Sequence, residues 1–434
     1  MNKLVGGFVE DISPRLCFLF TFLAICMLCT NAFPADITIT TPSSFPVFTF
    51  EIPTSNTLFG YSPYFAQSAS TAGDFNDDGN DDFAFGALIA TPPPPHSNLF
   101  YAGVVFVFWG QPTHYSPSSQ LPLLTSFPNS SLGLLIYGST AYQQIGYGIS
   151  GGCDVNNDHH PDLIISCRND EQSLPATVYI VFGRPHGGWD STPFLLLSSL
   201  TTSDGFKIIA ERSTNGWDNQ FGWRAPLCSQ DHNGDGIDDI LIGDSLVQGS
   251  TGRAVLIYGI SSWPLVINVT YPSSFNGGVT FTAQPRLPTQ CIGWALGSVD
   301  LNVDGHPDAV ISAHYAGGYR GFVHVIWGQD QSTLPLPSNM TLPVLSIAQG
   351  LHISGNVGLL GVSISAGDIN GDNHNDLVIA LKDSVLVVFS SSSFTWTVDM
   401  DCMAANSMLI SLEMAEIDIS VASGDINRDG FDDV

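Results

Sequence analysis

Residues 231–239 read Asp231-His-Asn233-Gly-Asp235-Gly-Ile-Asp-Asp239, and the same nine-residue pattern occurs six times along the chain. Position 1 is always Asp, position 3 is always Asn, and positions 5 and 9 are always Asp. The copies begin at 74, 154, 231, 300, 368 and 425, so successive starts lie 80, 77, 69, 68 and 57 residues apart. Four fixed positions do not recur six times by chance, and this periodicity is typical of a repeat architecture.

The segments that flank each copy also recur. An apolar-small pair precedes the first five copies by about eight residues: Phe65-Ala66, Ile145-Gly146, Phe221-Gly222, Ile292-Gly293 and Leu360-Gly361. The apolar runs that follow each copy predict further short strands. The first of these strands is expected at 83–86, 163–166, 240–243, 309–312 and 377–380; the second at 104–109, 178–182, 254–258, 322–327 and 385–389; the third at 134–137, 206–209, 279–282 and 351–354.

Four short strands in a unit of roughly 60–80 residues predict an all-β propeller of four-stranded blades. The composition agrees with this fold class. The chain of 434 residues has 34 Asp but only 6 Glu, together with 43 Gly and 27 Pro, which suits short strands and turns rather than helices. Its 44% hydrophobic residues are enough for a sizeable core.

The charge excludes two classes of function. Lys and Arg total 12 against 40 acids, for a net charge of −28. A protein that binds nucleic acid by neutralising phosphates needs the opposite sign, and so does one that adsorbs to anionic lipid.

The repeated loop predicts a calcium site. Side-chain oxygens at positions 1, 3, 5 and 9, with the backbone carbonyl of position 7, can surround one hard cation, and Ca²⁺ accepts six to eight oxygens. The expected ligands are Asp74, Asn76, Asp78, Asn80 and Asp82; Asp154, Asn156, Asp158, His160 and Asp162; Asp231, Asn233, Asp235, Ile237 and Asp239; Asp300, Asn302, Asp304, His306 and Asp308; Asp368, Asn370, Asp372, His374 and Asp376; Asp425, Asn427, Asp429, Phe431 and Asp433. Up to six Ca²⁺ are therefore predicted, whereas zinc would need nitrogen or sulfur ligands at a regular spacing.

The alternative interpretation of these loops is a set of solvated turns, because Asp, Asn and Gly favour turns. The six loops, however, hold 22 of the 40 acids, and clustered carboxylates repel one another unless a cation neutralises them. Glycine at position 6 eases the turn in four repeats, while His159 and Asn373 replace it in the other two. Because His tolerates the left-handed conformation less well than Asn, the second loop fits the calcium pattern least well, whereas the Asp425 loop is expected to have the poorest Ca²⁺ affinity.

The N-terminus predicts a secretory signal peptide over residues 1–32. Lys3 and Arg15 precede an apolar run of about 14 residues, and small residues before Phe33 supply a cleavage site. An uncleaved signal-anchor is the alternative. Five cysteines follow the leader, and an odd number leaves one unpaired; most are expected to be small core residues. Three sequons begin at Asn129, Asn268 and Asn339 and are compatible with a secreted glycoprotein.

The apolar-Gly pair, the Asp-x-Asn-x-Asp-Gly-x-x-Asp loop, the apolar strand after it and the strand that ends in an aromatic residue resemble the FG-GAP repeats of integrin α-subunit β-propellers. Similar repeats occur in glycosylphosphatidylinositol-specific phospholipase D and in many secreted microbial proteins. The resemblance covers about residues 36–434. It implies seven blades, Ca²⁺ in the loops of one face, and partners that dock on the opposite face.

Two departures from that pattern stand out. Ile417-Asp418 replaces the apolar-Gly pair of the sixth repeat, and all six loops hold the full ligand set although integrin α-subunits carry calcium in only some blades. The sixth repeat ends at Asp433, before the strands that should pair with its first strand. The expected domain organisation is therefore a leader and a propeller over 33–434 that is incomplete at its C-terminus.

Catalytic signals are weak. Gly148-Ile-Ser150-Gly-Gly152 matches a nucleophile-elbow pattern, but the repeat places Ser150 in the strand before the second loop. Trp109, Trp223, Trp294 and Trp327 occupy repeated positions and are expected to pack. Trp189, Trp217 and Trp263 lie between strands and are weak candidates for ligand contacts.

The predicted function is that of a secreted or cell-surface calcium-binding propeller that acts as an adhesion or ligand-binding module without catalysis. Its partner would be an extracellular protein or glycan, with no nucleic acid and a possible membrane tether in a longer form. The alternative is a carbohydrate-binding or scaffold propeller of a larger secreted enzyme, and a third possibility is the head of an anchored receptor.

Overall fold

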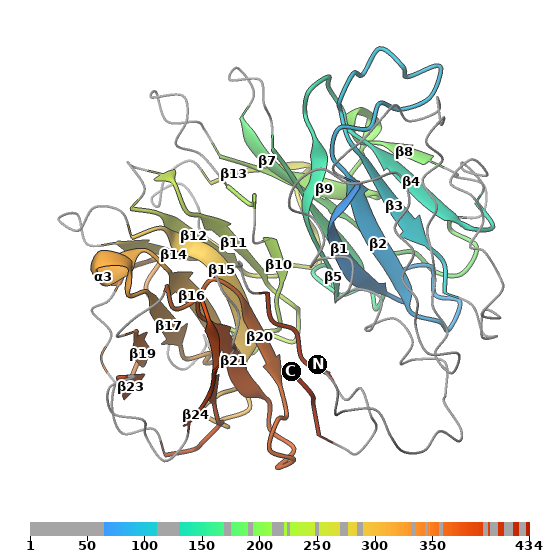
Figure 1. Ribbon diagram of the computed structural model, residues 1–434. Helices are drawn as coiled ribbons and strands as arrows, with labels where there is room; N and C mark the ends of the chain where they lie inside the picture. Colours follow the sequence, from blue (N-terminus) through green and yellow to red (C-terminus); the bar gives the residue numbers. More distant parts are fainter. Residues whose placement is uncertain are drawn as a thin grey trace, which may run out of the picture.

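The chain is described from a computed structural model, shown in Figure 1. The structure describes residues 65–110, 130–168, 175–189, 194–210, 221–223, 226–247, 251–269, 277–283, 290–330, 336–342, 346, 348–355, 359–393, 398–399, 407–411, 420–424 and 431–434. The predicted signal peptide, Asn129, Trp217, Cys402, Ile417-Asp418 and the ligands Asp425, Asn427 and Asp429 lie outside the described residues.

The described residues form five sheets, and the prediction of an all-β fold is confirmed. Sheet 1 is β1 (Phe65–Gly73), β2 (Asp82–Ala87), β3 (Val104–Phe108) and β4 (Gly133–Tyr137); sheet 2 is β5 (Ile145–Cys153), β6 (Asp162–Cys167), β7 (Ala176–Val181) and β9 (Gly205–Ala210); sheet 3 is β10 (Pro226–Cys228), β11 (Ile240–Asp244), β12 (Arg253–Ile257) and β14 (Gly278–Ala283). Sheet 4 is β15 (Ile292–Val299), β16 (Asp308–Ala313), β17 (Phe322–Ile326) and β19 (Gly350–Ser354); sheet 5 is β20 (Ile364–Gly367), β21 (Asp376–Ala380), β22 (Ser384–Val388) and β24 (Ser407–Ser411).

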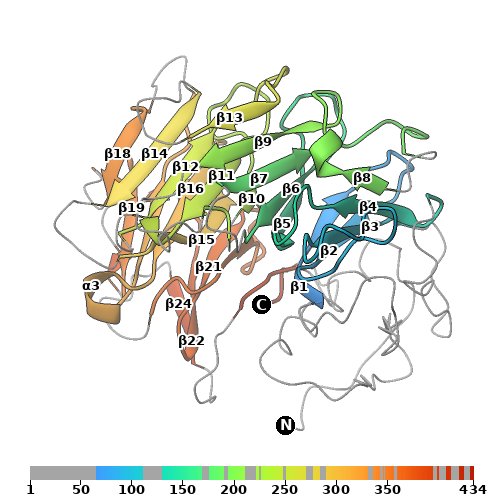
Figure 2. The same ribbon diagram turned by 90° about the horizontal axis from the view of Figure 1, so that it is seen from above.

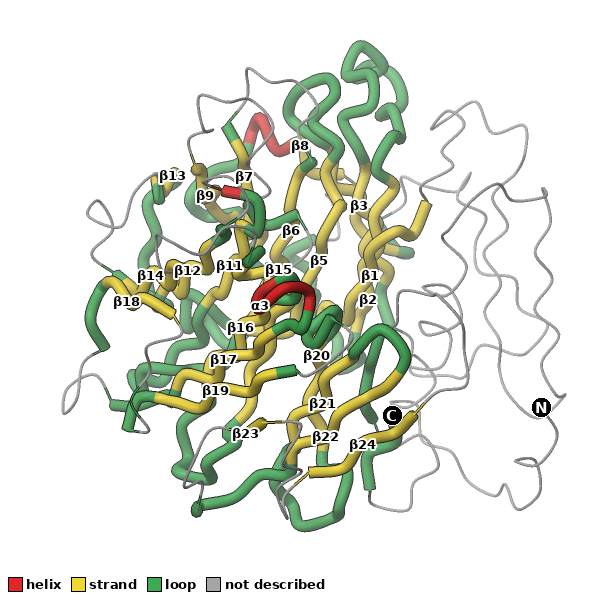
Figure 3. The backbone as a smooth tube through the Cα atoms, turned by 60° about the vertical axis from the view of Figure 1, so that its left-hand side comes forward, coloured by secondary structure: helices red, strands yellow, loops and turns green. Residues whose placement is uncertain are grey.

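Each sheet is an antiparallel meander in chain order, as the apolar runs predicted. Every strand predicted after a loop is present, with bounds shifted by no more than two residues. Helix is scarce: η3 (Leu197–Ser199) and α3 (Ala316–Tyr319) are short turns between strands (Figure 3). No helix among the described residues is long and apolar enough to cross a membrane.

A fifth strand extends four of the sheets, which the sequence did not predict. The outermost position of sheets 1 to 4 is taken by β8 (Phe194–Leu196), β13 (Val266–Asn268), β18 (Asn339–Leu342) and β23 (Val398–Asp399). Each comes from the connection between the third and fourth strands of the next repeat and runs parallel to the fourth strand of the sheet it joins. Neighbouring repeats are therefore interlocked at the outer edge.

The core lies between successive sheets. Figure 2 shows the sheets following one another in chain order, each with a face toward the next. One cluster joins sheets 1 and 2 and includes Phe75, Ile136, Ile165 and Trp189, and equivalent clusters join each later pair of sheets. Because both faces of the middle strands are covered, β3, β7 and β12 are buried at every position.

The glycine of the apolar-Gly pair is needed where one sheet meets the next. Gly146 has φ +84° and its α-carbon faces Gly86 of sheet 1, so that an added Cβ would lie 2.8 Å from the Cα of Gly86. Gly293 has φ +82° and meets Gly243 of sheet 3 in the same way. A side chain would be strained by the backbone angle and would also separate the sheets.

The sixth repeat begins another unit of the same kind. Ser423 donates from its hydroxyl to the carbonyl of Ala366 in sheet 5, and Gly424 forms an antiparallel bridge with Asp433. Gly73 and Asp82 make the equivalent pair in the first repeat. Five sheets and the start of a sixth are thus described, and a total of seven blades stays a prediction.

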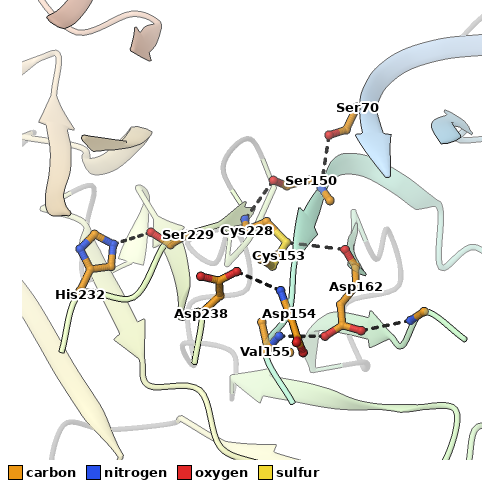
Figure 4. Close-up of a disulfide and its surroundings, with 12 residues drawn as sticks. Ser70, Ser150, Cys153, Asp154, Val155, Asp162, Cys228, Ser229, His232 and Asp238 are labelled. Atoms are coloured by element: carbon orange, nitrogen blue, oxygen red, sulfur yellow. Dashed lines mark hydrogen bonds between the residues drawn. A yellow bond between two sulfur atoms is a disulfide. The ribbon is translucent and has the colours of Figure 1, made fainter. Parts of the chain in front are cut away.

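Two of the cysteines form a disulfide, which the sequence did not indicate, while the expectation that most cysteines are core residues is confirmed by three buried ones. Cys153, at the end of β5, is bonded to Cys228 in β10, with a Cα–Cα distance of 5.4 Å (Figure 4). Cys167 and Cys291 are free and buried. The bond joins the first strands of sheets 2 and 3 immediately before their acidic loops.

Replacing both Cys153 and Cys228 with Ser should lower the free energy of unfolding by about 2–5 kcal/mol, because the bond closes a segment of 75 residues in the unfolded chain. Denaturant titration of the two proteins measures the difference. Alkylation of the unreduced, unfolded protein should leave both residues unlabelled, and labelling of either one would contradict the pairing.

Candidate metal centres

Each acidic loop joins the first strand of a sheet to the second, and its last residue opens the second strand or, in sheet 3, directly precedes it. That residue, the Asp at position 9, is 0–2% exposed in all five described sheets: Asp82, Asp162, Asp239, Asp308 and Asp376. In the first loop one oxygen of Asp82 accepts from the amide of Phe75 at 3.0 Å and the other from the amide of Gly110 at 2.6 Å. The same two bonds recur in every described loop.

The amide that follows the third strand explains the glycine after the aromatic residue in four repeats. A Cβ on Gly110 would lie 2.4 Å from the carbonyl oxygen of Asp81, and Gly183, Gly259 and Gly328 meet position 8 of their own loops equally closely. In these four sheets a residue without a side chain lets this amide reach the buried carboxylate while the strand passes so near. Ser390 occupies the place in sheet 5 and donates the same bond at 2.9 Å.

The carboxylates at positions 1 and 5 organise the turn from inside. In the third loop Asp231 accepts from the amides of Asp235 and Gly236, at 3.2 and 2.7 Å. Asp235 in turn accepts from the amide of Ile237 at 3.0 Å. The side chains at positions 1 and 5 therefore point into the loop, and all five described loops share this network.

The backbone is left-handed at positions 4 and 6 of each described loop, whereas the sequence indicated this only for position 6. Position 6 has φ between +67° and +90° in all five described loops, including His159 at +69° and Asn373 at +67°. His159 still donates its amide to Asp154 at 2.7 Å, so the second loop, which fits the sequence pattern least well, has the same left-handed position 6 as the others. Position 4 is also left-handed, even where it is the β-branched Val303 at +59°.

The position-9 carboxyls are shifted strongly toward their neutral form. Burial, together with the charges of the aspartates at positions 1 and 5, raises the pKa of Asp82, Asp239 and Asp308 to about 8 against the lowering effect of the amide hydrogen bonds. Burial also raises the pKa of Asp162 and Asp376. Three acids of each loop are thus close enough for their charges to oppose one another.

The loops are tied to the next sheet through position 2. An amide that follows the third strand of the next sheet donates to the position-2 carbonyl at 2.9–3.2 Å in the first four loops, where the acceptors are Phe75, Val155, His232 and Leu301. Position 8 adds a second link where it is Asp: Asp238 accepts from the amide of Asp154 at 3.0 Å, and Asp432 from that of Asp368 at 2.8 Å. Figure 4 shows Asp238 beside Asp154, next to the disulfide. The sequence pattern did not indicate these roles of positions 2 and 8.

The structure brings together the predicted ligands of each described loop, but as a hydrogen-bonded turn. Among the described residues no group of three His, Cys, Asp or Glu side chains is arranged to hold a metal ion. The carboxylates bind loop amides, and the Asn side chain at position 3 of the first four loops donates to the carboxylate at position 5. Phe431, at position 7 of the sixth loop, lies against Gly371 of the fifth.

The opposite ends of the sheets carry half-exposed aromatic residues. The connections between second and third strands lie at that end because the second strand runs away from the acidic loop. We call the set the aromatic face: Phe100, Tyr101, Tyr142, Tyr147, Trp223, Trp294, Tyr315 and Tyr319. Tyr101 and Tyr142 pack at 5.6 Å between ring centroids, and Tyr319 is 69% exposed.

Cationic and imidazole groups border this face. The guanidinium of Arg168 lies 5.7 Å above the ring of Trp223, and Trp294 packs on His314 at 3.9 Å. The interpretation of the tryptophans from the sequence is confirmed for Trp109 and Trp327, which pack in the core at 6% and 9% exposure, and is wrong for Trp189 and Trp263. Trp189 and Trp263 are buried at 2% and 7% exposure and serve as core, whereas Trp223 and Trp294 reach the surface.

The hydroxyl-bearing candidates have structural roles. Ser150 lies in β5, where its hydroxyl accepts from the amide of Cys228 at 2.9 Å. Ser229 and His232 form a close hydroxyl–imidazole pair, with the other ring nitrogen on the carbonyl of Pro307 at 2.6 Å. Both side chains of that pair are at most 2% exposed, so a substrate cannot reach them.

Residues 292–326 match the FG-GAP repeat family. Over 207 residues the chain is 28% identical to phosphatidylinositol-glycan-specific phospholipase D of Bos taurus, which covers 44% of this chain and 23% of that protein. It is 29% identical to integrin alpha-E of Mus musculus over 185 residues, covering 40% and 14%, and 31% identical to integrin alpha-PS2 of Drosophila melanogaster over 121 residues, covering 28% and 7%. The chain thus spans less than a quarter of the length of these relatives.

The sheets and the relatives together define the class of protein as a β-propeller. Its fourth repeat, centred on β15, β16 and β17, is an FG-GAP repeat, and the resemblance to integrin α-subunits stated from the sequence is confirmed.

The raised pKa values predict how the metal-free protein responds to pH. A carboxyl with a folded pKa of about 8 and an unfolded value of 3.8 keeps a proton that the unfolded chain loses, so its stabilising effect is full at low pH and is lost as pH rises toward 8. The melting temperature in chelator should therefore fall between pH 6.5 and 8. Each such carboxyl contributes up to about 1.4 kcal/mol per pH unit.

The range above pH 6.5 avoids the titration of the buried His232. Burial lowers the pKa of His232 to about 4, so between pH 4 and 6.5 its contribution to stability rises with pH, opposite to that of the carboxyls. Asp239→Asn should reduce the slope, whereas the exposed Asp81→Asn should not. A melting temperature that rises across this range would contradict the assignment.

Proposed function

We propose that this chain is a secreted, calcium-binding FG-GAP propeller that acts as an adhesion or ligand-binding module. The observation that supports it most is the repetition, in five described loops, of one turn that holds aspartates at positions 1, 5 and 9 near one another. A purely structural turn has no need of three opposed carboxylates, whereas a hard cation would satisfy them.

The chemistry of the donors favours Ca²⁺. Position 3 adds an amide oxygen and position 7 a backbone carbonyl, so each loop offers oxygen ligands alone. The hydrogen bonds from loop amides to positions 1 and 5 hold those carboxylates in place and leave lone pairs for a cation. Ca²⁺ in the loop would replace the protons that the raised pKa values of the position-9 carboxyls favour.

Bound calcium would also strengthen the contacts between sheets. The backbone of each loop accepts from the next sheet through position 2, and in two cases donates to the position-8 carboxylate of the next loop. A cation that fixes the loop fixes these partners as well. Calcium is therefore proposed as a structural component of the array rather than as a catalyst.

The aromatic face is the proposed site for a partner. Half-exposed Tyr and Trp side chains offer large contact areas at low conformational cost, and the partly buried Arg168 lies beside Trp223 as a polar neighbour. The acidic face is a poor alternative because its carboxylates are committed to the loops. An extracellular protein or a glycan would suit the aromatic face, since both are bound through stacked rings and neighbouring donors.

Export is supported by two features. The leader pattern over 1–32 is that of a secretory signal, and the Cys153–Cys228 bond belongs to an oxidising compartment. The disulfide is independent of the leader, so the two observations support one another.

A second candidate is a scaffold or carbohydrate-binding propeller within a larger secreted enzyme. The similarity to phosphatidylinositol-glycan-specific phospholipase D favours it, because the chain matches less than a quarter of that protein. On this alternative the aromatic face would hold the substrate or the catalytic domain, and this chain would itself supply no catalytic group.

Calcium removal is the direct test of the loops. Chelation should lower the melting temperature, and Ca²⁺ should restore it while Mg²⁺ does so poorly, because binding to a folded loop stabilises the fold. Asp78→Asn should weaken calcium binding at the first loop by at least tenfold in calorimetric titration. Asp81→Asn removes the same charge from the same loop at an exposed, non-ligand position and should bind normally. An identical melting curve with and without chelator would refute the calcium proposal.

The partner site can be tested with cells and a glycan array as probes. Beads coated with the protein should retain at least one probe, and Tyr319→Ala or Tyr101→Ala should lower retention severalfold without changing the melting temperature, since both side chains are exposed. Asp81→Asn, on the acidic face, is the matched control. Equal loss in the aromatic-face and control variants would argue against this placement.

A further inference from the structure

The outer edges of sheets 2 and 3 carry two of the three sequons. Asn268 is the last residue of β13 and begins Asn268-Val-Thr270; Asn339 is the first residue of β18 and begins Asn339-Met-Thr341. Both strands are the exchanged fifth strands, and no strand among the described residues pairs with their outer side. Both asparagines are exposed.

The register places the two asparagines on equivalent faces of their sheets. Asn268 pairs with Ile209, the fifth residue of β9, and Asn339 pairs with Thr280, the third residue of β14. Positions two apart in a strand point to the same side. In β18 the residues on the other side, Met340 and Leu342, are buried. The asparagines therefore lie on the solvent side of the edge.

These edges lack the usual protection against pairing with another chain. β13 reads Val-Ile-Asn and β18 reads Asn-Met-Thr-Leu, without a charged residue or a proline. Val266 is 42% exposed and the preceding Leu265 is 39% exposed. In sheet 4, Asp399 pairs with the fifth residue of the fourth strand, as Asn268 does in sheet 2. A charged side chain such as this one is a common protection of an edge strand. Sheets 2 and 3 have a glycosylation signal in place of that charge.

We propose that Asn268 and Asn339 carry N-linked glycans that cover the outer edges of sheets 2 and 3 and prevent them from pairing with other chains. In each transfer the side-chain Nδ2 forms a bond to the anomeric carbon of a lipid-diphosphate-linked oligosaccharide. The bond from that carbon to the diphosphate oxygen breaks, and the amide proton leaves as the lipid diphosphate is released. A bulky, hydrated chain at the edge then excludes a second strand.

The glycans would also restrict where a partner can bind. The fifth strands form the outer circumference of the sheets, away from the aromatic residues at one end and from the acidic loops at the other. A glycan at the circumference leaves the aromatic face open.

The test uses the full chain, expressed behind its own leader in a glycosylating eukaryotic host. Peptides released by amidase treatment in heavy-oxygen water should show conversion of Asn268 and Asn339 to labelled Asp. The double variant Thr270→Ala/Thr341→Ala removes both signals and should lose monomer severalfold faster on mild heating, as followed by size-exclusion chromatography with light scattering. Thr270→Ser/Thr341→Ser keeps both signals and should behave as the wild type.

Enzymatic removal of the glycans from folded wild-type protein gives the same comparison without any change of sequence. It should also accelerate the loss of monomer. Unmodified asparagines at both positions would overturn the proposal. Glycans whose removal leaves the monomer as persistent as before would overturn their role at the edges.

Discussion

The buried aspartate at position 9 of each repeat is the interaction on which the rest of the structure depends. Its two oxygens bind one amide from the start of the acidic loop and one from the end of the third strand, so a single side chain joins three segments of a sheet. The aspartate needs both bonds because it is buried, and an unpaired buried carboxylate would be costly. The loop, the hairpin after it and the residue beyond the next strand are therefore fixed together in every described repeat.

That arrangement links each repeat to its neighbour. The amide that satisfies the buried carboxylate comes from position 2, and the carbonyl of the same residue accepts from the following sheet. Two further kinds of link join successive sheets. The hydroxyl of Ser70 in the first strand of sheet 1 accepts a hydrogen bond from an amide in the first strand of sheet 2, and the exchanged fifth strands join neighbouring repeats at the outer edges. The disulfide adds a covalent link at the second boundary. Each repeat is thus completed by the next one, as expected where a single repeat cannot bury its own core.

The two ends of the sheets have different chemistry. One end concentrates carboxylates whose burial and mutual repulsion disfavour the ionised form without a cation, and the other end carries aromatic rings beside Arg168 and His314. The cost of burying the acids is tolerated because the loops are held by many hydrogen bonds and by the cores between sheets. A partner on the aromatic end would leave those loops undisturbed, which fits the proposed division between a structural face and a binding face.

The sequence by itself determined the repeat, the strands and the loop residues, because these follow from local patterns: apolar runs, turn-forming residues and acids at a fixed spacing. The tertiary structure decided what depends on contact between distant segments. β13 and β18 pair in parallel with strands of the preceding repeat, and no local pattern marks such a pairing. The pairing of Cys153 with Cys228, the surface position of Trp223 and the burial of Trp263 likewise depend on which sheet lies alongside. The left-handed backbone at Val303 is imposed by the carboxylates around it, since the intrinsic preference of valine opposes it.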